Sequence, residues 1–455
     1  MYDNDLRSIQ EARDLARAGQ AAAAKLASYS ARQIEAIIQN MVTAAERDAW
    51  LLAQMAVDET GFGNTADKMF KNHVAAGVFY DAIREIKTIG VISEDPRRKI
   101  VEIAEPVGLV LGIISSTNPT STVIFKSIMA LKARNSIVFS PHPQAASCTQ
   151  AAAALMSKAA IDAGAPEGII TCLTTPARVA VDELMSCDEV KTIIVTGGPG
   201  LVKAAYDSGK PALGIGAGNT PAYLERSARV TGAVHDIMAS KTFDYGTVCA
   251  SEQAVIVEEC NRDAAVAAFC REGGYFMSPS QCADVCELLF REGSNAMNPK
   301  FVGQPPRVIA EAAGIPVPVN TRALLGEQWG VGPDEPLSYE KLTTVLGFYT
   351  VKNKEEARKL CADLLQNGAG HTLSLHTEDE DIVREFSAGL ASRTLVNTGA
   401  TQGAIGLSTG LLPSLTLGCK NRDGSATSEN AGPQHLLRIK KVAYGLRSVD
   451  DLLLL

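Results

Sequence analysis

One of the ten cysteines of this chain differs from the others in its sequence context. Cys249 lies in segment 243–253, at a glycine-punctuated junction between an expected helix and an expected strand. At such a junction a thiol can attack a carbonyl carbon while its own backbone N–H stabilises the oxyanion. Cys249 is therefore the candidate nucleophile, and a packed structural thiol is the alternative. Six other cysteines, expected within helices, fit packed thiols: Cys148, Cys187, Cys270, Cys282, Cys286 and Cys361.

A thiolate that attacks a carbonyl needs a second hydrogen-bond donor for the developing oxyanion. Asn118, in segment 115–120, directly follows the first strand of a predicted parallel sheet, where ligand-binding residues are expected. An Asn-Pro turn without a catalytic role is the alternative interpretation of this pair.

A glycine-rich turn could hold a phosphate. Thr196-Gly197-Gly198 follows an apolar strand and opens a helix, whose free N–H groups and partial positive charge favour anions. The spacing is not the usual dinucleotide fingerprint, so a plain structural turn stays open. The segment 214–219, with Gly216, opens no helix and is expected to be a loop packed near a site.

Alternating strands and helices must position these residues. Helical periodicity covers the first ninety residues, and apolar strands alternate with helices over 107–208. Such continuous apolar strands predict an α/β fold, with a doubly wound parallel sheet that binds a nucleotide. A second α/β unit follows, then a Gly- and Ser-rich loop over 399–432 and a last strand at 436–443. The predicted domains are 1–223 for the cofactor, 224–408 with Cys249, and 409–455 as a C-terminal loop and strand.

The composition excludes several classes of protein. The 455 residues carry 43 basic and 51 acidic side chains, a net charge of −8, which argues against nucleic-acid binding. The cysteines form no CxxC pair, so neither a metal site nor a disulfide framework is expected. The polar start and the short apolar runs predict no export signal and no membrane helix, so we expect a cytoplasmic protein.

Several motifs together resemble the aldehyde dehydrogenase superfamily, and within it the coenzyme A-acylating branch. That branch includes the acetaldehyde and propionaldehyde enzymes of bacterial microcompartments and the aldehyde half of bifunctional aldehyde-alcohol dehydrogenases. The likeness extends over nearly the whole chain, without room for an iron-dependent alcohol dehydrogenase half, and implies a stand-alone enzyme. The motifs are EPVGLV at 105–110, SSTNPT at 115–120, TGGPG at 196–200, GAGN at 216–219 and GTVCAS at 246–251, supported by ETGFG at 59–63, DK at 67–68, KN at 71–72, SPHP at 140–143, GHT at 370–372 and PSLTLG at 413–418.

The resemblance implies roles for individual residues. Cys249 would be the nucleophile, Asn118 the side-chain oxyanion donor and Glu340 a partner of the nicotinamide ribose. Hydrolytic relatives hold the adenosine ribose with a Lys-Pro motif, and this chain differs there, which leaves NAD or NADP open; His142 is expected near the cofactor and His371 has no assigned role. The expected cofactor-binding set is Ser115, Thr117, Ser140, Pro141, His142, Thr196, Gly197, Gly198, Gly216, Glu340 and Leu342.

One departure concerns the second half-reaction. Where hydrolytic relatives carry a water-activating glutamate, alignment on Pro221 places Ile215. A thiol such as that of coenzyme A, with a pKa near ~8.5, needs less activation than water does. The resemblance therefore implies reversible, NAD-dependent conversion of a short-chain aldehyde to an acyl-CoA, with coenzyme A as co-substrate entering by the cofactor channel. The alternatives are a hydrolytic aldehyde dehydrogenase, an acyl-phosphate reductase, a non-redox cysteine acyltransferase and a non-catalytic scaffold.

The resemblance also implies partners. Segments 99–105 and 436–443 match the family's intersubunit strands, with 93–106 in an oligomerisation hairpin, so a homodimer or homotetramer is expected. Microcompartment shell or co-encapsulated enzymes are further candidate partners, although an N-terminal encapsulation peptide is expected to be absent or removed. The aldehyde pocket is expected near Ile405, Leu407, Leu411 or Leu412, and the tail 452–455 to be disordered or a docking patch.

Overall fold

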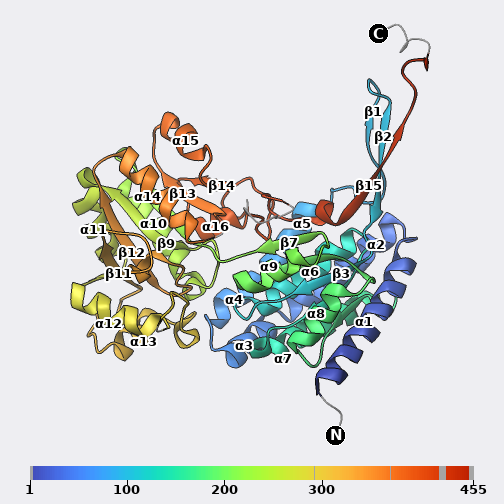
Figure 1. Cartoon of the computed structure of the whole chain (residues 1–455), viewed down its shortest axis with the longest axis horizontal. Helices are drawn as coiled ribbons and strands as arrows, with labels where there is room; N and C mark the ends of the chain where they lie inside the picture. The colour runs from blue at the N-terminus through green and yellow to red at the C-terminus, as the bar shows by residue number, and fades with distance from the viewer. Residues whose placement is uncertain (1–3, 292, 369, 420–426, 450–455) are drawn as a thin grey trace.

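The computed structural model describes residues 4–291, 293–368, 370–419 and 427–449. They form two α/β units that lie side by side, and a thin three-stranded arm that extends away from one of them (Figure 1). The predicted tail 452–455 lies outside the described residues. Both large sheets are entirely parallel, so the predicted α/β class is confirmed.

The N-terminal residues are helical, as their periodicity predicts. Ile34, Ile38 and Met41 are buried on one face of their helix, which begins with a capping box at Ser30. These helices cover the first α/β unit (Figure 1). They are α1 (Asn4–Leu26), α2 (Ala31–Arg47), α3 (Ala49–Thr60), α4 (Thr65–His73), η1 (Val74–Val78) and α5 (Phe79–Ile83).

The first unit contains a five-stranded sheet, here called the β3 sheet, with strand order β5-β4-β3-β6-β7. Its order reverses between β3 and β6, and Ile113 at the end of β3 pairs with both Ser140 and Val195. The loops after these strands therefore meet at one carboxyl edge, which is where an open parallel sheet binds ligands. The elements are β3 (Leu109–Ile113), α6 (Pro119–Lys132), β4 (Ser136–Ser140), η2 (Pro143–Ala145), α7 (Ala146–Asp162), β5 (Ile170–Cys172), α8 (Arg178–Ser186), β6 (Val190–Thr196), α9 (Pro199–Asp207) and β7 (Ala212–Ile215).

The second unit contains a seven-stranded sheet, here called the β9 sheet, with order β10-β11-β12-β9-β8-β13-β14. The chain changes sheets between β7 and β8, so the predicted domain boundary at residue 223 falls inside β8. The elements are β8 (Thr220–Leu224), α10 (Val230–Thr242), η3 (Phe243–Gly246), β9 (Glu252–Glu258), η4 (Glu259–Asn261), α11 (Arg262–Arg271), β10 (Gly274–Met277), α12 (Pro279–Leu289), η5 (Pro299–Phe301), α13 (Pro306–Ala312), β11 (Ala323–Gln328), η6 (Pro336–Ser338), β12 (Val345–Val351), α14 (Lys354–Gln366), β13 (Thr372–His376), α15 (Glu380–Ser387) and β14 (Arg393–Val396).

The prediction of continuous loop over 399–432 is wrong at its start. Residues Ala400–Ala404 form a short helix, α16, whose first N–H donates to the buried carboxylate of Glu252 at 2.6 Å. The N–H of Thr401 donates to Ser240 Oγ at 2.8 Å. These partners lie more than a hundred residues away, so tertiary contacts override the local loop composition.

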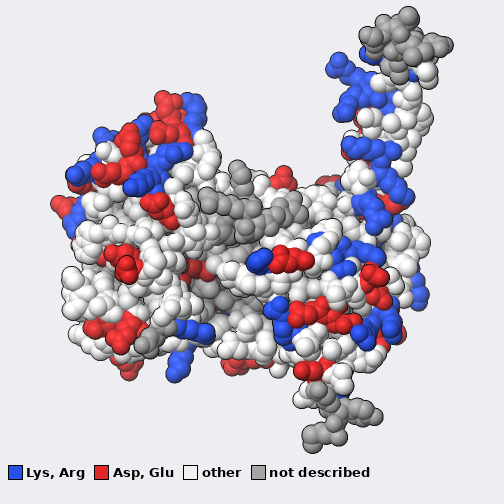
Figure 2. All heavy atoms as spheres, viewed as in Figure 1, with Lys and Arg blue, Asp and Glu red and all other residues white. Residues whose placement is uncertain are grey.

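The arm combines β1 (Gly90–Asp95), β2 (Ile100–Pro106) and β15 (Leu437–Ala443) in an antiparallel sheet; η7 (Pro433–Leu436) precedes β15. The predicted strands near 99–105 and 436–443 are confirmed, and they pair with each other. Lys and Arg side chains gather along the arm (Figure 2), where Lys440 and Lys441 form ion pairs with Glu105 and Glu102.

The described part of the chain lacks two kinds of feature. None of its helices is both long enough and apolar enough to span a membrane. None of its groups of three or more His, Cys, Asp and Glu residues is arranged to hold a metal ion.

Candidate active site

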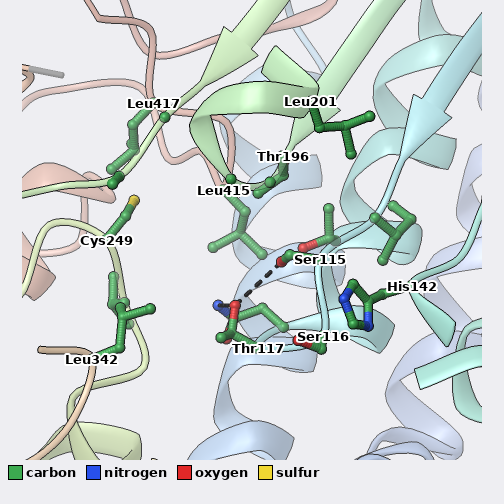
Figure 3. A pocket seen from close by; sticks show the side chains of 18 of the residues that line it. Ser115, Ser116, Thr117, His142, Thr196, Leu201, Cys249, Leu342, Leu415 and Leu417 are labelled. Carbon is green, nitrogen blue, oxygen red and sulfur yellow. Dashed lines mark hydrogen bonds between the residues drawn. The ribbon is translucent and has the colours of Figure 1, made fainter. Parts of the chain in front are cut away.

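A cavity of about 460 Å³ lies between the two α/β units. Cys249 and Leu342 enter it from one side, and His142, Thr196 and Leu201 from the other (Figure 3). Its volume is within the range of small-molecule and cofactor sites. The lining residues are Lys71, Ile114, Ser115, Ser116, Thr117, Asn118, Thr122, His142, Thr196, Gly197, Gly198, Pro199, Leu201, Gly216, Ala217, Val248, Cys249, Glu340, Leu342, Ile405, Leu415 and Leu417.

Cys249 lies just before β9, at the amino edge of the β9 sheet. The chain reaches it through a left-handed turn, with positive φ at Asp244 (47°), Tyr245 (50°) and Gly246 (79°). A Cβ at Gly246 would lie 2.8 Å from the carbonyl oxygen of Thr343, so the turn packs tightly against the chain before β12. Consecutive left-handed residues are unfavourable and persist only where surrounding structure imposes them. The junction predicted from the sequence is thus a tightly constrained one.

The segment 216–219 passes directly behind the candidate nucleophile. A Cβ at Gly218 would lie 1.7 Å from the carbonyl oxygen of Cys249 and 2.6 Å from Nε2 of His371, so only glycine fits. The sequence predicted a loop near a site here. Residues up to Ile215 instead belong to β7, and Gly216–Asn219 connects β7 to β8. The side chain of Ile215 is outside those that the structure describes.

Burial and nearby charge shift the pKa of the Cys249 thiol upward. Burial raises its pKa to about 12, the Glu340 carboxylate adds to this shift, and Arg393 opposes it. The surroundings of Cys249 in the free protein therefore favour the thiol over the thiolate.

Asn118 is the N-cap residue of α6, with Pro119 at the first helical position, but its side chain does not cap the helix. Its Nδ2 donates to the carbonyl oxygen of Thr247 at 2.9 Å, and its Oδ1 accepts from Nζ of Lys71 at 2.6 Å. The Asn-Pro turn and the site residue are therefore one feature: the turn aims the amide at the segment that carries Cys249.

The glycine turn lies at the carboxyl edge of the β3 sheet. No side chain caps the N-terminus of α9, and a Cβ at Gly198 would meet nothing within 4 Å. The first N–H groups of a helix lack intrahelical partners and favour an anion. Below the turn, the buried amino group of Lys126, whose pKa burial lowers to about 7, donates to the carbonyl oxygens of Ile113 and Ile194 and to Thr196 Oγ1. This end of the cavity suits a phosphate group.

Of the remaining residues expected to bind the cofactor, some line the cavity and others do not. Ser115 and Thr117 line the cavity and share a 3.2 Å hydrogen bond, and His142 also lines it, with its pKa lowered by burial. Ser140 and Pro141 are buried at the end of β4 and are not among the lining residues.

Glu340 is the one carboxylic acid among the described lining residues. Its Oε1 accepts from the N–H of Gly218 at 2.7 Å, and burial raises its pKa to about 8. Leu342, two residues later, has a positive φ of 36° and lies on the Cys249 side of the cavity (Figure 3).

His371 is buried behind Cys249. Its Nδ1 lies 2.7 Å from Thr372 Oγ1, its Nε2 has no hydrogen-bond partner, and burial lowers its pKa to about 3. The Arg393 guanidinium donates to the carbonyl oxygens of His371 and Gly418. Arg393 was missed from the sequence because its contacts come from segments far apart in the chain.

Of the four residues expected near the aldehyde pocket, one lines the cavity. Ile405 lines the cavity, whereas Leu407, Leu411 and Leu412 are not among the lining residues. Leu415 and Leu417 line it instead, within the PSLTLG motif at 413–418. Lys71 is a further lining residue that the sequence indicated only as part of a motif.

Known proteins share this architecture. The chain matches the Aldehyde dehydrogenase family over residues 3–272. It is 43% identical to the bifunctional aldehyde-alcohol dehydrogenase AdhE of Escherichia coli K12 over 424 aligned residues. The alignment covers 92% of this chain and 47% of AdhE. The chain thus spans about half the length of the curated relatives it matches first.

Solved structures match over nearly their full length. An acetylating aldehyde dehydrogenase from Geobacillus thermoglucosidasius has a TM-score of 0.96 and 47% identity, with 99% of each chain covered. A propionaldehyde dehydrogenase from the Clostridium phytofermentans fucose utilisation bacterial microcompartment has a TM-score of 0.87 and 25% identity, with 95% of this chain and 97% of that chain covered.

Proposed function

Because this chain belongs to the aldehyde dehydrogenase family, we propose that it oxidises a short-chain aldehyde to an acyl-CoA, reversibly, through a thioester on Cys249. The observation that carries the proposal is the meeting of three groups in one cavity: the Cys249 thiol, the Asn118 amide and the uncapped glycine turn at Thr196-Gly197-Gly198. Acetaldehyde and propionaldehyde are the proposed substrates, because the two solved relatives are named for acetylating and propionaldehyde activity.

The protein's own groups account for the attack on the aldehyde. Once the thiol proton has been lost to solvent, the Cys249 sulfur adds to the carbonyl carbon, and the oxyanion that forms receives hydrogen bonds from Asn118 Nδ2 and the Cys249 N–H. Each such donor lowers the activation barrier by about 3 kcal/mol. Besides the bond to Thr247, Asn118 Nδ2 makes only a longer contact of 3.3 Å with Thr117 Oγ1, so its second N–H can turn to the oxyanion by giving up that weaker contact.

The cavity fits a nicotinamide dinucleotide. The uncapped start of α9 and the open space at Gly198 would receive the pyrophosphate, and Glu340 would hold the nicotinamide ribose. When bound, this group supplies the hydride acceptor. Its adenosine end would lie toward His142. We propose NAD as the cofactor; Ser140-Pro141, which stand where hydrolytic relatives carry the ribose-binding lysine, leave NADP open as the alternative.

Coenzyme A is the proposed acyl acceptor. Ile215 stands where hydrolytic relatives carry a glutamate, and Glu340 already accepts a hydrogen bond from Gly218. A thiol needs less help than water, because a few per cent is thiolate at neutral pH. Hydrolysis is the second candidate, since the Glu340 carboxyl shares the cavity with Cys249 and could activate water.

We further propose a homodimer or homotetramer assembled through the arm, whose Ile439 and Val442 are 40% and 38% exposed. The proposed location is the cytoplasm, or the inside of a bacterial microcompartment together with its shell or co-encapsulated enzymes.

The test measures NADH formation from acetaldehyde and from propionaldehyde, with and without coenzyme A. Turnover that requires the thiol and releases the acyl-CoA supports the proposal. Equal turnover without coenzyme A, with free acid as product, selects hydrolysis through Glu340. No NADH under either condition overturns the redox function.

A further inference from the structure

Two lysines of α4 share one buried carboxylate beside the site. Nζ of Lys68 and Nζ of Lys71 lie 2.9 Å and 2.5 Å from Oδ2 of Asp244, and both lysines are 3% exposed while Asp244 is 0% exposed. We call these three residues the lysine–aspartate cluster. Burial favours the neutral acid, but the two ammonium groups outweigh it and hold the pKa of Asp244 below its usual value. The cluster joins the helical layer of the first unit to the turn that precedes Cys249.

The carboxylate of Asp244 is held in place from several sides. Its Oδ1 accepts from the N–H of Asn64 at 2.9 Å, and its own N–H donates to Asp67 Oδ2 at 2.7 Å. A Cβ at Gly63 would lie 1.8 Å from Oδ1, so the chain passes as close as glycine allows. With Asp244 fixed in a left-handed backbone conformation, the ammonium groups bound to it are fixed as well.

Only one of the two lysines touches the oxyanion donor. Lys71 Nζ lies 2.6 Å from Asn118 Oδ1, whereas Lys68 Nζ donates to the carbonyl oxygen of Thr117 at 2.8 Å. The three protons of Lys71 meet Asn118, Asp244 and, at 3.4 Å, the oxygens of Thr247. With its protons engaged by these groups, Lys71 contacts the proposed oxyanion site directly through Asn118.

This contact sets both the orientation and the strength of the Asn118 amide. An ammonium on Oδ1 prevents the amide from flipping, since a flip would place two N–H donors against a cation. The Nδ2 group therefore faces the Cys249 segment, where it donates to the carbonyl oxygen of Thr247 at 2.9 Å. The positive charge also polarises the amide, and charge-assisted hydrogen bonds are about twice as strong as neutral ones.

We propose that Lys71 is a positioning residue for the oxyanion site, which fixes and polarises the Asn118 amide while Asp244 keeps the ammonium in place. This inference rests on the proposed role of Asn118. The chain offers a matched control in Lys68, which has the same burial and the same carboxylate partner but does not contact Asn118.

The experiment is a double-mutant cycle with Lys71→Met, Asn118→Ala and the double variant, alongside Lys68→Met. We expect Lys71→Met to lower kcat by about ten- to a hundredfold, with KM for the aldehyde changed by less than about threefold. Lys68→Met should lower kcat by less than about threefold. Both lysine variants should lose similar thermal stability, because each removes one cation from Asp244. The double variant should be no slower than Asn118→Ala alone, since the two residues act as one unit.

Two results would overturn the inference. In the first, the fold loss of kcat in the double variant equals the product of the losses in Lys71→Met and Asn118→Ala. In the second, Lys71→Met and Lys68→Met lose kcat equally. If Lys71→Met does not fold, Lys71→Gln keeps an N–H donor without the charge, and its full activity would contradict the need for a cation.

The cycle is also run on cleavage of 4-nitrophenyl acetate, which needs only the thiol and the oxyanion site. If coenzyme A-dependent turnover is absent but the ester assay still shows the expected differences among the variants, the proposed function fails and this inference stands. If the ester assay shows no such differences, this inference fails.

Discussion

The two sides of the cavity belong to opposite edges of parallel sheets. Thr196, Gly198 and Asn118 follow strands of the β3 sheet at its carboxyl edge, and Cys249 precedes a strand of the β9 sheet at its amino edge. At a carboxyl edge helices begin, so backbone N–H groups and positive dipole ends point into the site. At the amino edge α10 has just ended, and no such donors are available from its end.

This difference explains how each side is built. The glycine end needs little more than backbone, small residues and the buried amino group of Lys126, which leaves room for an anion. The thiol end uses a left-handed turn, the close approach of Gly218 and the lysine–aspartate cluster. A reaction centre requires fixed atoms, whereas a phosphate cradle requires open N–H groups, and the two edges supply these separately.

The largest expected effect is at the thiol itself. Cys249→Ala should lower aldehyde-dependent NADH formation by at least about a thousandfold, because no other group can form the thioester. The exposed thiol of Cys260 provides the control, and Cys260→Ser should keep normal turnover. If Cys249→Ala keeps normal turnover, the nucleophile is another residue, and the thiol end of the cavity is not the reaction centre.

Adding one methyl group at the thiol end should also lower kcat strongly. Gly218→Ala places a Cβ against the Cys249 carbonyl oxygen, so the nucleophile must shift, and we expect kcat to fall about a hundredfold. Gly232→Ala, where a Cβ would meet nothing within 4 Å, is the control and should be neutral. Comparable kcat in the two variants, measured by NADH formation, would show that the close approach does not constrain the thiol.

The pH dependence of thiol alkylation tests the environment of Cys249. With its pKa raised to about 12, only the rising thiolate fraction reacts, so the rate should increase by up to about tenfold per pH unit from pH 7 to 9 without a plateau. Ionisation of Glu340 near pH 8 adds negative charge nearby and should reduce the slope above that pH. The measurement is iodoacetamide labelling of Cys249 by mass spectrometry, and a plateau below pH 8 would contradict a buried, unactivated thiol.

The smallest effect is expected from the same methyl group at the glycine end. Gly198→Ala has open space for its Cβ, so folding should be unaffected, while the proposed pyrophosphate site is partly filled. We expect KM for NAD to rise about three- to tenfold with kcat nearly unchanged. A kcat loss as large as that of Gly218→Ala would erase the contrast between the two ends.

Much of the β3 sheet could be predicted, and less of the β9 sheet. Long apolar strands that alternate with periodic helices are visible in 107–208, and the structure has them there. In the second unit, the strands β8, β10 and β11 were not predicted from the sequence. The helix α16 was missed because its N-terminus is held by Glu252, a residue 148 positions away.

In the site, too, some features could be predicted from the sequence and others could not. The sequence by itself determined the fold class, the family and a short set of candidates that includes Cys249, Asn118 and the glycine turn, because local spacing and motifs carry that information. Only the tertiary structure decided that Ser140 and Pro141 lie off the cavity, that Gly218 supports Cys249, and that Lys71 reaches Asn118. These facts depend on which edges of two parallel sheets face each other, and no local pattern in the chain encodes that arrangement.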